Sequence, residues 1–231
     1  MRRAPRRNPM GKWNGHSWAC AMLLMCIAVV APAQTFNSLL NLDGNDGTNP
    51  VAGLVQGVDR AFYGTAISGG ANDWGAIFKV TSDGALTTLY SFCPQSDCTD
   101  GALPSAGLTL VPGGDFYGTT AAGGANRSGV VFKLSAAGVF STLYSFCAQT
   151  NCTDGSEPLA ALIQGTDDNF YGTTNAGGAD GAGSVFKITR EGTLTTLHSF
   201  CLQGNCSEGS FPTAGLIQGT DGNFYGTTSF G

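Results

Sequence analysis

The chain has 231 residues and is 42% hydrophobic but only 12% charged, with 35 glycines and a formal net charge of −5. This hydrophobic content is ample for a buried core and excludes a disordered chain. Beyond residue 33 the six lysine and arginine residues are dispersed and acidic residues outnumber them, which excludes an electrostatic surface for nucleic acid or anionic lipid there.

Residues 1–33 predict a secretory signal peptide. Five arginine and lysine residues precede an unbroken apolar run, Ala19–Ala31, and small residues lead up to a cleavage site after Ala33. A membrane anchor is the alternative, but the run is short for a bilayer-spanning helix. We therefore expect a mature chain of residues 34–231 that is secreted or held at the cell surface and is not inserted into the membrane. Loss of five basic residues would lower its formal charge from −5 to −10.

Two short segments open the expected mature chain. Residues 36–42, FNSLLNL, align with the last strand of the later repeats and predict a single outer strand. Residues 43–49, DGNDGTN, are rich in oxygen ligands but lack the spacing of a calcium loop, so they predict a turn and no metal site.

The rest of the chain is a tandem repeat. The tyrosine of a Tyr-Gly-Thr motif recurs every 54 residues, and one proline and a pair of cysteines keep the same interval; the tyrosines are Tyr63, Tyr117, Tyr171 and Tyr225. A constant period indicates one structural module per unit. In each unit, aromatic and β-branched residues alternate with small or polar ones between Asp, Asn and Gly turns, which predicts four antiparallel strands.

A four-stranded module of this length is typical of a β-propeller blade. We therefore predict an all-β fold, a β-propeller with blades at about residues 52–92, 106–146 and 160–200 and a partial blade at 214–231. A β-solenoid and a β-sandwich are the alternatives, but solenoid coils are shorter and a sandwich would not repeat at a constant interval. Because the fourth copy has only two strands, we expect an incomplete ring and a longer intact protein.

Strand order places the long loops. In a propeller, the glycine-rich loop between the second and third strands opens onto the same face as the link that leaves the fourth strand. Since function concentrates in loops on a rigid scaffold, this face is the default binding surface. Each link carries a C-x4-C pair, and export favours disulfides over a metal site. The expected disulfide cysteines are Cys93, Cys98, Cys147, Cys152, Cys201 and Cys206.

Candidates for chemistry are few. The segment GGADGAGS (177–184) has the glycine content of a phosphate loop but no lysine before Ser184 and no following helix, so no nucleotide or other cofactor is expected. His198 stands where other units have tyrosine, which indicates packing rather than catalysis. A carboxylate recurs after each cysteine pair, at Asp100, Asp154 and Glu208. Paired carboxylates can act as a catalytic acid and base, but one that recurs in every unit indicates a structural role, in which it binds the backbone N–H groups of a turn.

The positions that differ between the copies of the glycine-rich loop, while its glycines are kept, indicate where a ligand would bind. Trp74 could stack on a sugar ring or anchor a protein partner, or it could cap the apolar edge of its blade. The candidate ligand-face residues are Asn72, Asp73, Trp74, Asn126, Arg127 and Asp180.

The unit P-x-A-G-L-I-Q-G-T-D-G-N-F-Y-G-T-T at Pro212–Thr228, together with G-x-V-F-K-I-T at Gly183–Thr189, closely resembles the GloVer (Gloeo/Verruco) tandem repeat. The strand layout is more distantly similar to NHL-type propellers. The GloVer resemblance implies an exported bacterial repeat scaffold and brings no catalytic or ligand residues with it.

The sequence thus predicts a scaffold that binds an extracellular protein or glycan and has no catalytic activity. One alternative is an extracellular propeller lyase or hydrolase that acts on polysaccharide. The other is a structural spacer.

Overall fold

The structure is a computed structural model that describes residues 38–202 and 206–231. The predicted signal peptide, with its cleavage site at Ala33, lies outside the described residues. Within those residues, no helix is long and apolar enough to cross a membrane.

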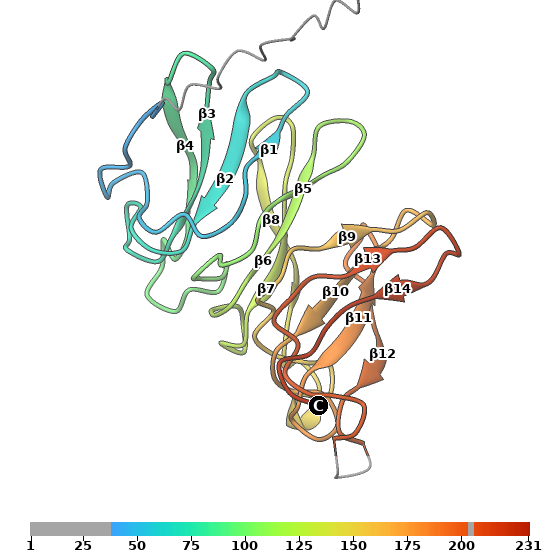
Figure 1. Ribbon diagram of the computed structural model, residues 1–231. Helices are drawn as coiled ribbons and strands as arrows, with labels where there is room; N and C mark the ends of the chain where they lie inside the picture. Colours follow the sequence, from blue (N-terminus) through green and yellow to red (C-terminus); the bar gives the residue numbers. More distant parts are fainter. Residues whose placement is uncertain (1–37, 203–205) are drawn as a thin grey trace, which may run out of the picture. The chain divides into compact units, whose positions relative to one another are not determined.

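The fold consists of antiparallel sheets in which each strand pairs with the next along the chain (Figure 1). The described residues form three four-stranded sheets and one two-stranded sheet. The first contains β1 (Val55–Gln56), β2 (Phe62–Ala66), β3 (Ala76–Val80) and β4 (Leu86–Ser91). The second contains β5 (Thr109–Leu110), β6 (Phe116–Thr120), β7 (Val130–Leu134) and β8 (Phe140–Ser145). The third contains β9 (Ile163–Gln164), β10 (Phe170–Thr174), β11 (Ser184–Ile188) and β12 (Leu194–Ser199). The fourth contains β13 (Ile217–Gln218) and β14 (Phe224–Tyr225), and a short 3-10 turn, η1 (Thr150–Cys152), interrupts the second link.

The glycine of each of the first three Tyr-Gly-Thr motifs makes room for a phenylalanine on the neighbouring strand. Gly172 on β10 pairs with Phe186 on β11, and a Cβ on Gly172 would lie 2.6 Å from the Cζ of Phe186. The ring of Phe186 is fully buried. Any larger residue at this glycine would therefore displace a core aromatic side chain.

Neighbouring sheets pack face to face through two aromatic clusters. One cluster joins the first and second sheets and includes Phe92 and Phe132; the other joins the second and third and includes Phe146 and Phe186. A repeated hydrogen bond crosses each interface, as when the buried Thr119 Oγ1 donates to the carbonyl of Ala160 at 3.1 Å. Thr65 and Thr173 make the equivalent bonds. Each sheet is thus one layer of a repeated, blade-like packing.

Of the outer strand predicted at residues 36–42, the structure describes Ser38–Leu42. Ser38–Leu42 forms no strand. The Leu39 carbonyl nevertheless lies beside Gly84 in the β3–β4 turn, as the carbonyl of Leu143 on β8 lies beside Gly192 in the β11–β12 turn. The predicted turn at residues 43–49 takes the place of a link between sheets. Its Gly44 carbonyl accepts a bond from Gly70 N at 2.9 Å, as the Cys98 carbonyl does from Gly124 N in the next unit.

Candidate binding surface

The three cysteine pairs are disulfide-bonded, with Cα–Cα distances of 4.1, 4.0 and 4.1 Å. Each disulfide closes a link that joins the fourth strand of one sheet to the first strand of the next. The Cys98 carbonyl accepts backbone bonds from Gly101 N at 2.9 Å and from Gly124 N at 2.8 Å. The Cys152 carbonyl accepts the same bonds from Gly155 and Gly178. The first two disulfide links are therefore each bonded to the glycine-rich loop of the next sheet.

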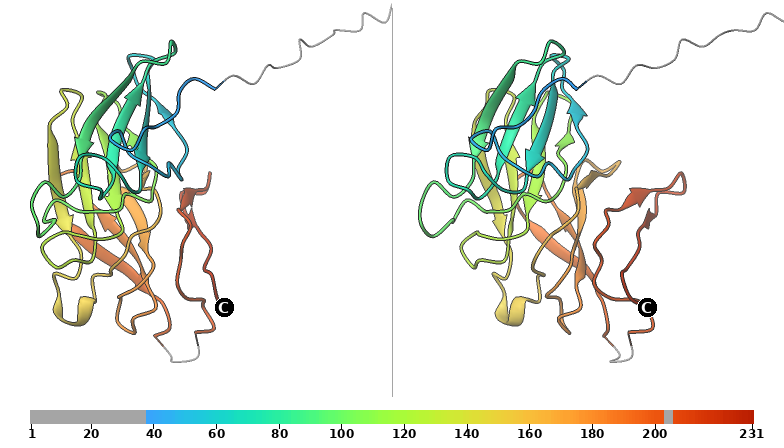
Figure 2. Two further views of the ribbon diagram at one scale, coloured as in Figure 1. Left: turned by 90° about the vertical axis from the view of Figure 1, so that its left-hand side faces the viewer. Right: turned by 60° about the vertical axis from the view of Figure 1, so that its left-hand side comes forward.

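We call this surface the loop face: the glycine-rich loops at residues 67–75, 121–129 and 175–183 with the links at 92–101 and 146–155. These segments lie toward the lower ends of the sheets in Figure 2. The first glycine of each Gly-Gly pair is required there. Gly123 has a φ of +74°, and a Cβ on it would lie 2.6 Å from the backbone carbon of Gly101. The glycines thus allow link and loop to approach closely, as a tight bend requires.

The recurrent carboxylates hold the links together. Asp154 is fully buried and accepts bonds from Tyr144 Oη at 2.8 Å, Ala148 N at 2.9 Å and Gln149 N at 3.2 Å. Burial and the bond to Asp154 raise the pKa of Tyr144. A carboxylate with three such donors stabilises a turn.

The equivalent carboxylates are held less completely. Asp100 accepts bonds from Tyr90 Oη at 2.7 Å and Cys93 N at 3.1 Å, while its buried Oδ1 has no partner. Pro94 stands where Ala148 donates in the next link, and proline has no N–H. Glu208 accepts a bond from Leu202 N at 3.1 Å. All three carboxylates are therefore engaged with backbone donors.

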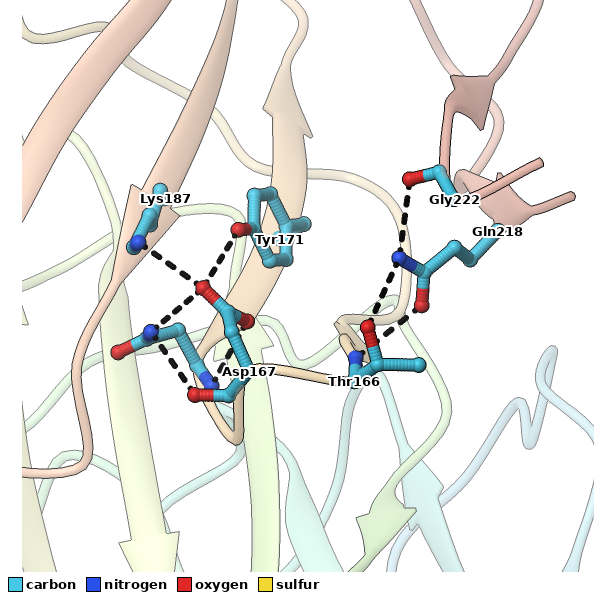
Figure 3. A network of polar contacts seen from close by, with 7 residues as sticks. Thr166, Asp167, Tyr171, Lys187, Gln218 and Gly222 are labelled. Carbon is cyan, nitrogen blue, oxygen red and sulfur yellow. Dashed lines mark hydrogen bonds and ion pairs between the residues drawn. The ribbon is translucent and has the colours of Figure 1, made fainter.

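A second polar cluster, which the sequence reasoning missed, lies at the turn between the first two strands of a sheet (Figure 3). The Asp167 Oδ2 accepts bonds from Tyr171 Oη and Lys187 Nζ, both at 2.9 Å, and from Asn169 Nδ2 at 2.7 Å. The ring of Tyr171 also stacks on Phe224 of the next sheet at 3.9 Å. The first sheet repeats the cluster with Asp59, Tyr63 and Lys79.

The pKa shifts in this cluster are those of a closed ion pair. The bond from Lys79 lowers the pKa of Asp59, and the bond to Asp59 raises the pKa of Lys79. Burial, followed by the bond to Asp59, raises the pKa of Tyr63. A catalytic base or acid needs a pKa near the working pH, and each of these shifts moves the pKa of its group further from neutral pH. The cluster therefore fixes the turn.

His198 is exposed on the outer strand β12. Its ring makes a T-shaped contact with Phe200 at 4.8 Å, as Tyr144 does with Phe146. Among the described residues there is no group of three or more His, Cys, Asp or Glu side chains that could hold a metal ion.

The six candidate ligand-face residues divide into two groups. Asn72 and Asn126 donate their side-chain amides to the carbonyls of Phe92 and Phe146, at 3.0 and 3.1 Å, so they anchor the loops. The others are exposed at the loop tips: Asp73, Trp74, Arg127 and Asp180. Asp73 and Arg127 occupy the same left-handed position, with φ of 63° and 61°.

Comparison with known families agrees with this architecture. A model of the Gloeobacter/Verrucomicrobia repeat matches residues 27–231. The chain belongs to this repeat family. As a Gloeobacter/Verrucomicrobia repeat protein, it owes its fixed 54-residue period to the shared unit, and the exposed loop tips are where its own copies differ. No curated protein matches the chain.

Solved structures resemble this repeat protein in fold. A streptogramin B lyase matches with a TM-score of 0.51 at 18% identity, over 81% of this chain and 50% of the lyase. The chain thus spans about half the length of that structure. A structure described as a gluconolactonase by assignment matches with a TM-score of 0.48 at 11% identity, and the match covers 76% of this chain and 56% of that chain. The similarity to the streptogramin B lyase structure, together with the four-stranded antiparallel sheets, confirms the predicted propeller-type fold.

Proposed function

We propose that this repeat scaffold is an extracellular interaction module, secreted or displayed at the cell surface, whose loop face binds a protein or a glycan without catalysis. The observation that carries the proposal is the bonding of the first two disulfide links to the glycine-rich loops of the next sheets, by Gly124 N to Cys98 O at 2.8 Å and Gly178 N to Cys152 O at 2.9 Å. This bonding fixes the loop tips before a ligand arrives.

A preformed surface reduces the entropy that binding costs, because loops and side chains need not be ordered on association. Trp74 is 45% exposed, and Arg127 is exposed at the tip of the next loop. Trp and Arg are the residue types most often found at binding hot spots, and an exposed Trp can also stack on a sugar ring. Exposed tips on successive sheets suit the broad contact that a polymer or a protein surface offers.

Export is supported by two features. One is the signal peptide predicted at residues 1–33, and the other is the set of three disulfides, since such bonds persist in oxidising compartments. The enzymatic alternative has weaker support. Asp154, the best-placed candidate carboxylate, is fully buried and engaged by three donors.

A glycan array and a pull-down with extracellular proteins, both using residues 34–231, test the proposal. Once a ligand is found, Trp74→Ala and Arg127→Ala are each expected to weaken its binding by at least about tenfold. Val139→Ala, which changes a 64% exposed residue in the β7–β8 turn away from the loop face, is the control and should leave binding unchanged. Blank screens would instead favour a structural spacer, and equal binding by all three variants would show that the ligand binds away from the loop face.

A further inference from the structure

The turns at the ends of the sheets opposite the loop face pack unequally. In the third sheet, the β11–β12 turn packs against β8, because the carbonyl of Leu143 lies where a Cβ on Gly192 would be. In the first sheet, the carbonyl of Leu39 lies 2.9 Å from a Cβ on Gly84. Gly138 has the same place in the β7–β8 turn, but no heavy atom of the described residues, apart from its chain neighbours, lies within 4 Å of a Cβ on it. The interface between the first and second sheets is therefore open at this end.

This opening is a groove of about 280 Å³, which we call the turn groove, and both of its walls belong to complete four-stranded sheets. At the interface between the second and third sheets, the matching space holds Arg190, whose Nε is buried and whose guanidinium pairs with Asp168 at 3.5 Å. The pKa of Asp115 on the facing sheet is lowered mainly by the bond from Lys133 and in addition by the charge of Arg190. In the second sheet, the positions that match Arg190 and Asp168 line the turn groove and are small: Ala136 and Gly114. The second sheet therefore leaves unfilled the space that Arg190 takes in the third.

The turn groove has an apolar lining with one ion pair. Apolar side chains come from both sheets: Val58, Tyr63, Leu89, Phe116 and Leu134. The charged residues of the lining are Asp59 and Lys79, one of each sign, so their charges balance. This lining suits a neutral ligand that has both an apolar face and polar groups.

The ion pair keeps hydrogen-bonding capacity. Asp59 Oδ2 accepts bonds from Lys79 Nζ at 2.6 Å and Tyr63 Oη at 3.0 Å, and its Oδ1 accepts one from Ala61 N at 3.2 Å. A carboxylate has about four lone pairs and an ammonium group has three N–H donors, so both groups can form further bonds. The side chains of Asp59 and Lys79 are 39% and 30% exposed. Adjacent hydroxyl groups of a ligand can therefore bond to the carboxylate and the ammonium group at once, and bonds to charged groups are the stronger kind.

We propose that the turn groove binds one neutral sugar ring, either as a free sugar or as one residue of a glycan. Adjacent hydroxyls of the ring would bond to Asp59 and Lys79, and the C–H face of the ring would lie on the apolar lining. A volume of about 280 Å³ suits one ring rather than several, since ligand sites usually measure about 300–1,000 Å³. A charged ligand gains less, because it meets a like charge beside the opposite one. The site lies at the opposite ends of the strands from the loop face and goes beyond the proposed function.

Two-dimensional amide NMR of residues 34–231, titrated with the methyl glycosides of glucose, galactose and mannose, tests the site. At least one glycoside is expected to bind with a dissociation constant of about 1–10 mM, as for a ligand of this size, and to shift the amides of Gly114 and Ala136–Gly138. The matching trisaccharides distinguish the source of the ring: equal affinity indicates a single ring, and tighter binding indicates a glycan chain. Glucuronate and N-acetylarginine amide are the charged probes, and both should bind more weakly than the glycoside.

Variants of the protein localise the site. Ala136→Arg should weaken sugar binding by at least about tenfold, because the arginine would fill the groove as Arg190 fills the next interface. Ser82→Arg is the matched control. Ser82 has the same place in the β3–β4 turn but does not line the groove, so this variant should leave binding unchanged.

A second pair of variants tests the polar contacts. Asp59→Asn should weaken sugar binding by about fivefold, since it removes a charged acceptor. Asp167→Asn is its control, because Asp167 makes the same bonds, to Tyr171 and Lys187, in the third sheet and does not line the groove.

Absence of binding up to about 100 mM glycoside would overturn the proposal. So would unchanged binding in Ala136→Arg, equal losses in the two members of either pair, or tighter binding of a charged probe. Loss of sugar binding in Trp74→Ala but not in Ala136→Arg would also overturn it, because the sugar would then lie on the loop face.

Discussion

Phe132→Ala is expected to lower the free energy of unfolding by about 4 kcal/mol. Phe132 is fully buried, and its ring centroid lies 5.4 Å from those of both Phe92 and Phe140. Its ring also covers Gly118 on the neighbouring strand. Alanine would leave a cavity where the first and second sheets meet, and the rigid sheets on either side could close it only in part.

Urea denaturation of residues 34–231 measures this effect. Leu197→Ala is the control, because Leu197 on β12 is 50% exposed and should change the free energy of unfolding by less than about 0.5 kcal/mol. Equal losses in the two variants would contradict the assignment of Phe132 to the packing between sheets.

Asp154→Ala is expected to destabilise the protein by about 3 kcal/mol, because it leaves the donors on Tyr144, Ala148 and Gln149 without their acceptor. Asp154→Asn, which keeps one acceptor oxygen, should cost less. Asp97→Ala, at an exposed residue of the preceding link, should have almost no effect.

The same variants separate a structural carboxylate from a catalytic one. The structural role predicts that Asp154→Asn loses stability in thermal or urea unfolding. A catalytic role predicts unchanged stability together with loss of activity on a polysaccharide panel. The second result would revive the enzymatic alternative.

Local pattern was sufficient to predict most of the fold. The turn residues and the alternating pattern of the strands repeat every 54 residues. An element that is misassigned in one unit can therefore be corrected by comparison with the other units. The outer strand at residues 36–42 had no such check, because its alignment to β4 required a four-residue shift from the common period. Ser38–Leu42 forms no strand, although the Leu39 carbonyl lies beside Gly84 as the carbonyl of Leu143 on β8 lies beside Gly192.

The binding surface was less predictable from sequence because side-chain roles depend on pairing between distant segments. Asn72 and Asn126, two of the predicted ligand-face residues, each donate to a carbonyl 20 residues later in the chain, a bond that the sequence did not indicate. The polar cluster of Asp167, Tyr171 and Lys187 was missed, although tyrosine and lysine keep a constant spacing of 16 residues in the three complete units. Their cross-strand register, which places Tyr171 opposite Lys187, is what brings them together.

The central claim is that disulfide links hold the loop face in place. Amide hydrogen exchange of Gly70, Gly124 and Gly178, with and without a reductant, tests it most directly. Gly124 and Gly178 donate to the carbonyls of Cys98 and Cys152, whereas Gly70 donates to Gly44 in a link without cysteine. Reduction is predicted to speed exchange at Gly124 and Gly178 by at least about tenfold, as the links gain freedom, and to leave Gly70 unchanged. Equal behaviour of all three amides, whether protected or exposed, would contradict the claim.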